Sequence, residues 1–369
     1  MRVAFVLGTS AGGVGRHVAM LAGGLLRRGH RVVVAGPQST EEAFGFGGLG
    51  ARFVPVPISD RPRPAADLRA VRALRALRGA DAVHAHGLRA GALAALALAG
   101  TGTGPVVTLH NAATAGGAVG AVHAVLERVV ARLAGRILVV SPDLGDRMAA
   151  LGARHVEGAV VPAPELAPPG RSPEEIRAEL GAGDRPVLLT VARLAQQKGL
   201  ETLLDVAAAL ASGSGRSGGT GPEARALFLV AGEGPLREEL QRRIDAEDLQ
   251  VRLLGNRSDV GDLLAVARAL VVPSRWEGQP LSVQEALRAG TPVVATAVGG
   301  IPPMVGGGGV LVPYGDAAAM AGAVGRIVAD DGFAGELARE AARRGGELPG
   351  EPEALEAVLS VYAGLGRAR

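Results

Sequence analysis

The strongest constraint on the fold is a recurring unit in which a short, nearly continuous apolar run is followed by a Gly-rich or polar turn and an Ala/Leu-rich segment. Strands that are buried on both faces have such unbroken apolar runs. Their alternation with helical segments predicts parallel strands joined by right-handed crossovers, which is an α/β fold. The predicted strands, in chain order, are Val3–Leu7, Arg31–Ala35, Ala82–His84, Val106–Leu109, Ile137–Val140, Val187–Val191, Leu227–Ala231, Val251–Leu254, Ala269–Val272 and Pro292–Ala295.

A proline-rich stretch at 161–186 separates two series of five predicted strands. It contains a helix start in which Ser172 is the N-cap and Pro173 takes the first helical position. We interpret this stretch as an interdomain linker between an N-terminal domain at 1–164 and a second domain at 165–350, followed by a C-terminal helix at 351–369. Doubly wound domains of this kind bind ligands at the carboxyl ends of their strands.

The composition supports two domains and excludes several kinds of site. A chain of 369 residues with 48% hydrophobic residues can bury two sizeable cores. The absence of cysteine excludes disulfides, thiolate nucleophiles and cysteine-ligated metals, and it fits a cytoplasmic location. A net charge of +3, with two tyrosines and one tryptophan, does not provide the basic, aromatic surface of a nucleic-acid-binding protein.

The first predicted strand leads into a glycine-rich turn, Gly12-Gly13-Val14-Gly15-Arg16-His17. Glycines there let backbone N–H groups approach a phosphate, and the following helix presents its positive end. The spacing does not fit G-x-G-x-x-G, and the second strand ends without an acid that could hold an adenosine ribose. A dinucleotide-dependent dehydrogenase is therefore disfavoured, while a tight turn without a ligand stays open as the alternative.

Two cations, Arg193 and Lys198, bracket the turn after the first strand of the second series. Cations in this position can converge on one diphosphate and neutralise the negative charge that develops when a phosphate leaves. The alternative is a pair of solvated surface cations. The strand–turn–helix setting favours the diphosphate.

Two carboxylates, Glu277 and Glu285, lie eight residues apart. Glu277 precedes the predicted loop Gly278-Gln279-Pro280-Leu281, and Glu285 lies about one turn into the helix that follows. A helix start supplies free N–H groups and a positive dipole end for a phosphate. One carboxylate can then bind sugar hydroxyls and the other ribose hydroxyls, whereas an unrelated pair of surface acids is the less favoured interpretation.

These blocks together resemble retaining glycosyltransferase family 4, the glycosyl transferases group 1 with the GT-B fold. The matching blocks are Val191-Ala192-Arg193, Lys198-Gly199, Val230-Ala231-Gly232-Glu233-Gly234-Pro235, Leu254-Gly255, Pro273-Ser274-x-x-Glu277-Gly278 and Glu285-Ala286-x-x-Ala289-Gly290-x-Pro292-Val293-Val294-Ala295. The Gly12-Gly13 turn and His110 match the first domain of that family, so the resemblance covers nearly the whole chain. It implies two Rossmann-like doubly wound parallel-sheet domains that face each other across a cleft, with the C-terminal helix at 351–369 crossing back to pack on the first domain.

The resemblance also implies roles for residues of the second domain. Arg193 and Lys198 would hold the diphosphate of a nucleotide-sugar, and Glu285 would bind its ribose hydroxyls. Glu277 would contact the hydroxyls of the donor sugar. Many members of the family carry Phe or Leu where this chain has Gln279, so a polar side chain there is expected to alter the preference for the donor sugar.

In the first domain, the resemblance implies that Gly12 and Gly13 bring backbone to the phosphate. His110 would lie near the transferred sugar. Arg16 and His86 are candidates for the acceptor side. A zinc site at His84 and His86 is disfavoured because the sequence offers no evident third ligand, and a purely structural role for His86 stays open.

The implied reaction moves a hexose-type sugar from a UDP- or GDP-linked donor to an acceptor hydroxyl with retention of configuration. The sequence has no Asp-x-Asp motif for a bridging divalent cation, so Arg193, Lys198 and a helix terminus would take its place, and no cofactor or metal is expected. Same-face attack and a short-lived covalent intermediate at Glu277 both stay open. A nucleotide-sugar epimerase of GT-B type and a non-catalytic sugar-nucleotide-binding scaffold are the alternatives from other classes.

Arginines recur every third residue from Arg69 to Arg78, at 69, 72, 75 and 78, with apolar residues between them. The pattern predicts an amphipathic helix with a basic face. Such a face is most often solvated, but it can also rest on anionic lipid. The sequence therefore predicts a cytoplasmic protein with an optional peripheral contact to the membrane, which would suit a lipid-linked acceptor.

Overall fold

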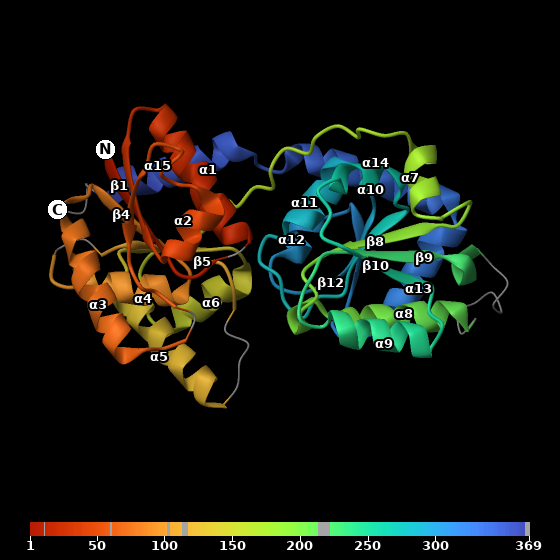
Figure 1. The fold of residues 1–369 in the computed structure, drawn as a ribbon, viewed down its shortest axis with the longest axis horizontal. Helices are drawn as coiled ribbons and strands as arrows, with labels where there is room; N and C mark the ends of the chain where they lie inside the picture. Colours follow the sequence, from red (N-terminus) through yellow and green to blue (C-terminus); the bar gives the residue numbers. More distant parts are fainter. Residues whose placement is uncertain (11, 60, 102–103, 113–116, 213–221, 366–369) are drawn as a thin grey trace. The chain divides into compact units, whose positions relative to one another are not determined.

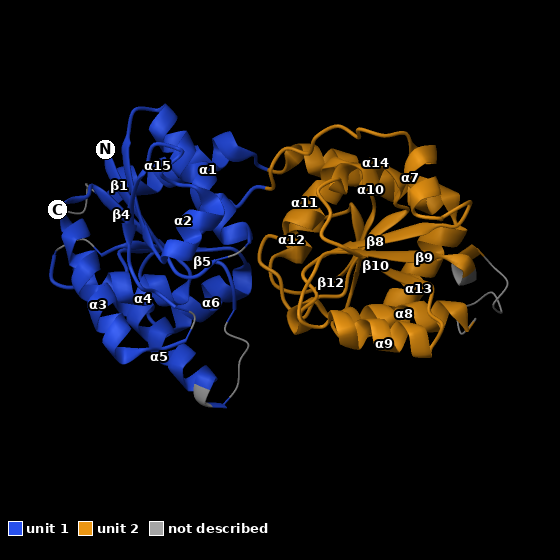
Figure 2. Ribbon diagram, in the orientation of Figure 1, with its two compact units in different colours: residues 1–162, 349–369 blue, residues 163–348 orange. Residues whose placement is uncertain are grey.

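The computed structural model describes residues 1–10, 12–59, 61–101, 104–112, 117–212 and 222–365. The chain forms two compact units (Figure 2). Unit 1 comprises Met1–Pro162 and Pro349–Arg369, and unit 2 comprises Ala163–Leu348. The chain therefore enters unit 2 once and returns to unit 1 with its last helix.

Within the described residues, unit 1 contains a seven-stranded parallel sheet with the order β3-β2-β1-β4-β5-β6-β7 (Figure 1). The bounds of its strands are β1 Arg2–Leu7, β2 Arg31–Gly36, β3 Arg52–Pro55, β4 Ala82–His86, β5 Val106–Leu109, β6 Arg136–Val139 and β7 Val156–Gly158. β1 and β4 are fully buried apart from Arg2 at the first position. The centre of this sheet is therefore covered on both faces, as the unbroken apolar runs predict.

Two helical layers cover this sheet. The helices of the unit are α1 Gly13–Arg27, α2 Gln38–Phe44, α3 Pro64–Leu74, η1 Arg75–Gly79, α4 Leu88–Leu98, α5 Gly117–Leu133, α6 Pro142–Ala150 and α15 Glu351–Leu365. α4 packs between α3 and α5 on one face, and α1 packs against α15 on the other (Figure 1). A Cβ at Gly24 of α1 would lie 2.9 Å from the Leu355 side chain, so this glycine allows the two helices to approach closely.

Unit 2 contains, in its described residues, a six-stranded parallel sheet with the order β10-β9-β8-β11-β12-β13. Its strands are β8 Val187–Val191, β9 Leu227–Ala231, β10 Val251–Gly255, β11 Ala269–Val272, β12 Val293–Thr296 and β13 Gly309–Val312. Side chains alternate between two cores along each strand. Phe228 and Val230 of β9 belong to one core, while Leu227 and Leu229 belong to the other.

The helices of unit 2 are α7 Pro173–Glu179, η2 Gln196–Lys198, α8 Leu200–Ala211, η3 Pro222–Arg225, α9 Arg237–Ala246, α10 Val260–Val266, α11 Leu281–Arg288, α12 Ile301–Val305, α13 Ala317–Ala329 and α14 Asp331–Glu347. The helices α8, α9 and α13 bury their apolar residues in one core, and α7, α10, α11 and α12 bury theirs in the other (Figure 1). Both units are thus doubly wound parallel-sheet domains, which confirms the predicted fold class.

All ten predicted strands are present, with ends that differ by at most two residues from the prediction. Three further strands, β3, β7 and β13, were not predicted. Each lies at the edge of its sheet, where one side of the backbone is unpaired and side chains are partly exposed. Without burial on both faces, such strands need no continuous apolar run, so the pattern that identified the others does not reveal them.

The stretch 161–186 differs from the predicted linker, because nearly all of it belongs to unit 2. Its helix α7 begins with a capping box formed by Ser172 and Glu175. Ile176 and Leu180 are buried in the core of unit 2. The proline-rich segment 161–186, called the strap below, is therefore packed onto unit 2. Only residues 162 and 163 lie at the boundary between the units.

The predicted basic helix from Arg69 to Arg78 is also interrupted. α3 ends at Leu74, and a 3-10 helix continues to Gly79. The tighter winding changes the angular spacing of the last arginines, although Arg69, Arg72, Arg75 and Arg78 are all exposed. No helix among the described residues is long and apolar enough to cross a membrane.

Candidate functional site

Both sheets reverse their direction of winding beside their first strand. In unit 2 the chain passes from β8 to β9 on one side, and β11 pairs with β8 on the other. In unit 1 the same point lies between β1 and β4. Ligands of doubly wound sheets bind outside the carboxyl ends of the strands at this topological switch point. The predicted site residues lie at or beyond the carboxyl ends of β1, β4 and β5 in unit 1 and of β8 and β11 in unit 2.

In unit 2, the segments after β8 and β11 pack directly against each other. Gly199, which follows Lys198, has φ 61°, and a Cβ there would lie 2.1 Å from the carbonyl oxygen of Pro273. The Gln197 Nε2 donates to the Trp276 carbonyl at 3.0 Å, and the Arg275 N–H donates to the Gln197 carbonyl at 2.8 Å. These contacts bring together the two loops that carry Lys198 and Glu277.

The carboxylate of Glu277 is buried, with 6% of the residue exposed. The Lys198 Nζ and the Ser274 Oγ both donate to its Oε1, each at 2.6 Å. A cation and a hydroxyl on the same oxygen compensate for the loss of water around a buried charge. The backbone is fixed as well, because the Gly300 N–H donates to the Glu277 carbonyl at 3.0 Å and a Cβ at Gly299 would lie 1.9 Å from that oxygen.

The second carboxylate, Glu285, lies in α11. This helix starts at Leu281, and the preceding Pro280 has no side-chain acceptor that could cap the first N–H groups. Glu285 is half-buried. Its neighbour Gln284 accepts the Ala163 N–H on Oε1 at 2.8 Å, and Arg288 donates to the Ala163 carbonyl at 2.9 Å. α11 is therefore anchored to the first residue of unit 2.

The other two predicted loop residues, Gly278 and Gln279, connect Glu277 to Pro280, and Gly278 is buried while Gln279 is half-buried. Arg193, the remaining predicted donor residue, is exposed beyond the end of β8. Unit 2 thus offers an exposed guanidinium, a Lys–Glu pair and the start of a helix at one edge of its sheet. Such a set suits a ligand that has both phosphate and hydroxyl groups.

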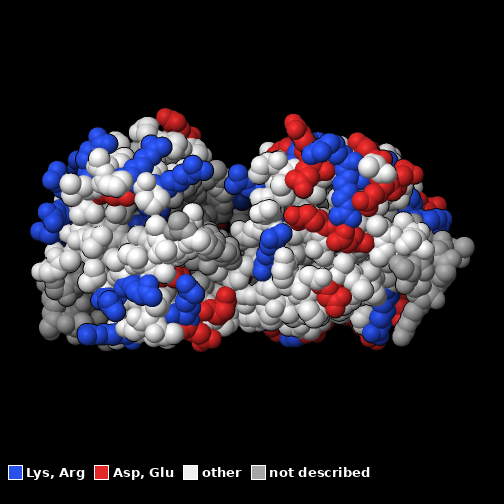
Figure 3. Space-filling view, turned by 90° about the horizontal axis from the view of Figure 1, so that it is seen from below, with Lys and Arg blue, Asp and Glu red and all other residues white. Residues whose placement is uncertain are grey.

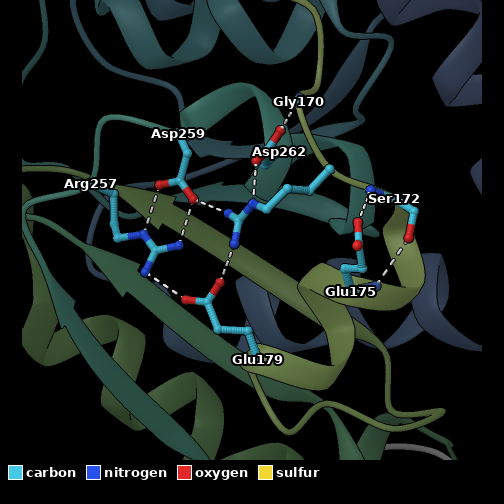
Figure 4. Close-up of polar contacts among 8 residues, drawn as sticks. Gly170, Ser172, Glu175, Glu179, Arg257, Asp259 and Asp262 are labelled. Carbon is cyan, nitrogen blue, oxygen red and sulfur yellow. Dashed lines mark hydrogen bonds and ion pairs between the residues drawn. The ribbon is translucent and has the colours of Figure 1, made fainter.

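A cluster of charged residues fixes the loop after β10 (Figure 4). Arg257 donates to Asp259 and Glu179, each at 2.8 Å. Arg171 pairs with the same two carboxylates and donates to Asp262 at 2.8 Å. Hydrogen bonds from Arg257 hold the pKa of Asp259 below its usual range. The strap before α7 is thereby tied to residues 257–262.

In unit 1, the glycine turn after β1 leads into α1, which starts at Gly13. A Cβ at Gly15 would overlap the Phe44 ring at 2.1 Å, so this glycine serves packing. A Cβ at Gly12 would meet no atom of the described chain within 4 Å. Packing against the described residues therefore does not explain Gly12. Arg16, on the first turn of α1, is exposed.

Four histidines gather at the carboxyl ends of β4 and β5. The His86 Nδ1 and the His110 Nε2 are 3.0 Å apart. The His17 ring from α1 lies edge-on to both, with ring centroids at 5.7 and 5.8 Å. The His84 ring stacks on His86 with centroids at 4.2 Å. The structure therefore brings together the predicted residues His86 and His110.

Burial keeps these histidines neutral. It lowers the pKa of His17 to about 4. Burial, aided by the nearby His17, lowers the pKa of His110 to about 3. The pKa values of His84 and His86 are also well below the usual value, again because of burial and the neighbouring rings.

Sequence reasoning missed three residues that support these groups. Ser274 holds the Glu277 carboxylate, His17 packs on the histidine pair, and the Tyr362 hydroxyl lies 2.7 Å from the His84 Nδ1. Ser274 and His17 stand inside motifs that were already recognised. Tyr362 gives no local signal, since its contact is 278 residues away in the chain.

Among the described residues, no group of three or more His, Cys, Asp or Glu side chains is arranged to hold a metal ion. His84 uses its two nitrogens for the Tyr362 hydroxyl and the Thr108 Oγ1, both at 2.7 Å. Both ring nitrogens of His84 therefore take part in hydrogen bonds within the protein.

Two protein families match the chain. Residues 12–164 match the glycosyl transferase 4-like domain, and residues 185–330 match the glycosyl transferases group 1. The chain is 31% identical over 320 residues to D-inositol 3-phosphate glycosyltransferase 1 of Catenulispora acidiphila, covering 78% of this chain and 73% of that protein.

The chain is also similar to alpha-D-kanosaminyltransferase of Streptomyces kanamyceticus, at 31% identity over 199 residues, 52% of this chain and 48% of that enzyme. With this relative the match thus spans about half of the relative's length. Among solved structures, Anabaena HepE in complex with UDP and glucose has a TM-score of 0.79 at 18% identity, with 99% of this chain and 100% of that one covered, which shows a shared fold. On these matches the chain belongs to the glycosyl transferases group 1 and has the GT-B fold.

Proposed function

We propose that the protein transfers a hexose-type sugar from a nucleoside-diphosphate sugar to an acceptor hydroxyl, without a metal and with retention of configuration. The proposal rests on the groups at the carboxyl ends of β8 and β11, which are neighbouring strands of the unit 2 sheet. These groups are Arg193, the Lys198–Glu277 pair and the start of α11. The set offers charge for a diphosphate and carboxylates for hydroxyl groups.

Each residue has a defined task in this proposal. Arg193 and the N–H groups at the start of α11 bind the diphosphate, and Glu285 binds the ribose hydroxyls. Lys198 moves from Glu277 to the diphosphate when the donor binds, because the phosphate carries more charge than one carboxylate. Glu277, held by Ser274, then accepts hydrogen bonds from sugar hydroxyls. His110, Gly12 and Gly13 act from unit 1.

The comparisons support the donor class. HepE was crystallised with UDP and glucose, and the kanosaminyltransferase and the inositol phosphate glycosyltransferase are named for sugar transfer. The proposal leaves the base of the donor open between uridine and guanosine. The acceptor would carry the hydroxyl to be glycosylated, with Arg16 and His86 as acceptor-side candidates.

A thermal-shift panel of UDP, GDP and their common sugars, with EDTA present, tests the donor site. At about 100 times its Kd, a bound nucleotide stabilises the folded state by about 2.7 kcal/mol. For a domain the size of unit 2, this raises the Tm by about 5–10 °C. We expect one of the two nucleotides to produce this shift and Glu285→Ala to remove most of it.

The matched control is Glu239→Ala, which removes an exposed acid from α9 on the same unit. It is expected to keep the full shift. A wild-type protein that no nucleotide stabilises would contradict the proposal, and a shift that appears only with a divalent cation would contradict metal independence.

We also propose a membrane contact on unit 1 for a lipid-linked acceptor. Leu68 of α3, Leu96 of α4 and Val125 of α5 are exposed by 51%, 43% and 58%. These three helices lie side by side. Lys and Arg side chains border a largely uncharged area on the face of unit 1 seen in Figure 3. An apolar area with basic side chains beside it suits an anionic lipid surface.

Co-sedimentation with vesicles tests this contact. We expect binding to vesicles that contain phosphatidylglycerol and weak binding to vesicles of phosphatidylcholine alone. The double variant Arg69→Glu/Arg72→Glu should bind at least tenfold more weakly, since each basic residue near the surface contributes about 1 kcal/mol. Arg242→Glu/Arg339→Glu, which changes exposed arginines of unit 2 by the same charge, should bind like the wild type. Equal binding of both variants would contradict the proposal.

A further inference from the structure

The hydrogen bond between His86 and His110 restricts where the protons of both rings can lie. The two nitrogens, His86 Nδ1 and His110 Nε2, are 3.0 Å apart, and the rings are nearly parallel at 23°. Both side chains are neutral because burial lowers their pKa values. A neutral imidazole has one N–H and one acceptor nitrogen. One of the two rings must therefore donate and the other accept.

The remaining nitrogen of His86 decides which ring donates. His86 Nε2 is buried and has no hydrogen-bond partner in the part of the chain that the structure describes. If His110 donated, the single proton of His86 would lie on this nitrogen as a buried, unpaired N–H. If His86 donates from Nδ1, the N–H without a protein partner is instead the Nδ1–H of His110, a residue that is only half-buried. An unpaired N–H costs most when it is fully buried, as at His86 Nε2, so the second arrangement is favoured.

We propose that His86 is a positioning residue that donates from Nδ1 and thereby holds His110 as the Nδ1–H tautomer. The inference rests on the proposed function, in which His110 acts on the donor sugar. His110 Nδ1 has no hydrogen-bond partner among the described residues. With its Nε2 occupied by His86, His110 offers the sugar an N–H donor and has no free lone pair with which to accept a proton. It orients a sugar oxygen and is not a general base.

The surroundings of His86 fix its ring. His84 stacks on it at 4.2 Å and is itself held at both nitrogens, by Tyr362 and Thr108. The Phe5 ring lies 5.7 Å away on β1. His86 is 2% exposed. A ring so enclosed cannot flip without breaking its contacts, so Nδ1 stays directed at His110.

Long-range ¹H–¹⁵N NMR of the full chain, labelled with ¹⁵N-histidine and free of nucleotide, reads the tautomer directly. The His110 signals are assigned by their absence in His110→Gln. We expect a protonated Nδ1 and an unprotonated Nε2 in the wild type. A wild-type His110 with its proton on Nε2, or with both tautomers in exchange, overturns the proposal without any variant of His86.

Two matched variants separate positioning from packing. His86→Leu removes the donor to His110. His84→Leu makes the same substitution two residues earlier on the same strand, where the side chain bonds Tyr362 and Thr108 instead. We expect mixed tautomers of His110 in His86→Leu and the wild-type tautomer in His84→Leu. An unchanged His110 in His86→Leu overturns the proposal.

Turnover provides the functional readout. With UDP-glucose as probe, we expect His86→Leu to lower the kcat of UDP release at least tenfold while the Kd of UDP, which depends on unit 2, stays within twofold. An unchanged kcat overturns the role in positioning. If the wild type neither binds nor turns over UDP- or GDP-sugars, the proposed function fails, whereas the tautomer measurement still decides the hydrogen-bond direction.

Discussion

Replacing Lys198 by alanine is expected to lower kcat/KM for release of UDP from UDP-glucose, or of GDP from a GDP-sugar if that is the donor, by at least 100-fold. Lys198 is the cation that the structure holds against Glu277, at 2.6 Å, beside the start of α11. Removing one preorganised group that stabilises developing charge typically costs about 100- to 1,000-fold in rate. In the variant the Ser274 hydroxyl would still donate to the Glu277 carboxylate, but the cation would be gone.

Steady-state kinetics of nucleoside diphosphate release measure this effect. Arg275→Ala is the matched control, because Arg275 is a cation of the adjoining loop that carries Glu277, but it pairs with Glu201, at 3.7 Å. It is expected to stay within threefold of the wild type. Lys198→Arg keeps the charge but replaces a compact ammonium with a planar guanidinium, and it should recover only part of the rate. A Lys198→Ala enzyme with kcat/KM within threefold of the wild type would refute the assigned role.

Stability distinguishes this loss from unfolding. Breaking a buried ion pair costs about 3–5 kcal/mol when both charges are fully buried. Here the Lys198 side chain is 25% exposed, so solvent can screen the Glu277 carboxylate and the cost should be smaller. Thermal unfolding of Lys198→Ala should therefore still show a cooperative transition for unit 2, at a temperature above that of the assay.

The fold could be predicted largely because its central strands are buried on both faces. Such strands need apolar side chains at nearly every position, so β1, β8 and β9 are visible in the sequence as unbroken runs. The edge strands β3, β7 and β13 were missed for the same physical reason. The strap at 161–186 was misjudged because prolines are compatible both with a linker and with a chain packed on a surface, and burial of Ile176 decides between them.

The candidate site was predictable as a set of residues but not as a set of contacts. Motifs placed Lys198 and Glu277 after strands, yet their ion pair joins residues 79 apart and depends on β8 and β11 being neighbours. Strand order is a property of the whole sheet, and no local pattern encodes it. The histidine cluster shows the same limit, since His17, His86 and His110 come from three separate elements.

Acidification is expected to destabilise unit 1 selectively between pH 6.5 and about 4. An unfolded histidine takes up a proton as the pH falls through about 6.5. In the folded state burial lowers the pKa of His17 to about 4 and, with a smaller contribution from His17, that of His110 to about 3. The unfolded state therefore binds more protons in this range, and the free energy of unfolding falls as the pH falls. Above pH 6.5 this contribution to stability is fully present.

The magnitude follows from the shift of each pKa. One pKa unit corresponds to about 1.4 kcal/mol, so His17 alone removes about 3 kcal/mol of stability when the pH falls from 6.5 to 4. The other three buried histidines act in the same direction. Since a small domain is stable by about 5–15 kcal/mol, the cluster is expected to unfold unit 1 well before the acids of unit 2 titrate.

Calorimetry from pH 7.5 to 4.5 tests this expectation with an internal control. All seven histidines lie between residues 17 and 155, so unit 2 contains none, and its transition should change little over this range. His17→Leu should reduce the pH slope of the unit 1 transition by about 1.4 kcal/mol per pH unit. His155→Gln, which changes an exposed histidine of the same unit, should keep the wild-type slope. If both variants keep that slope, the buried cluster is not the origin of the acid sensitivity, and the neutral state inferred for His86 and His110 loses its support.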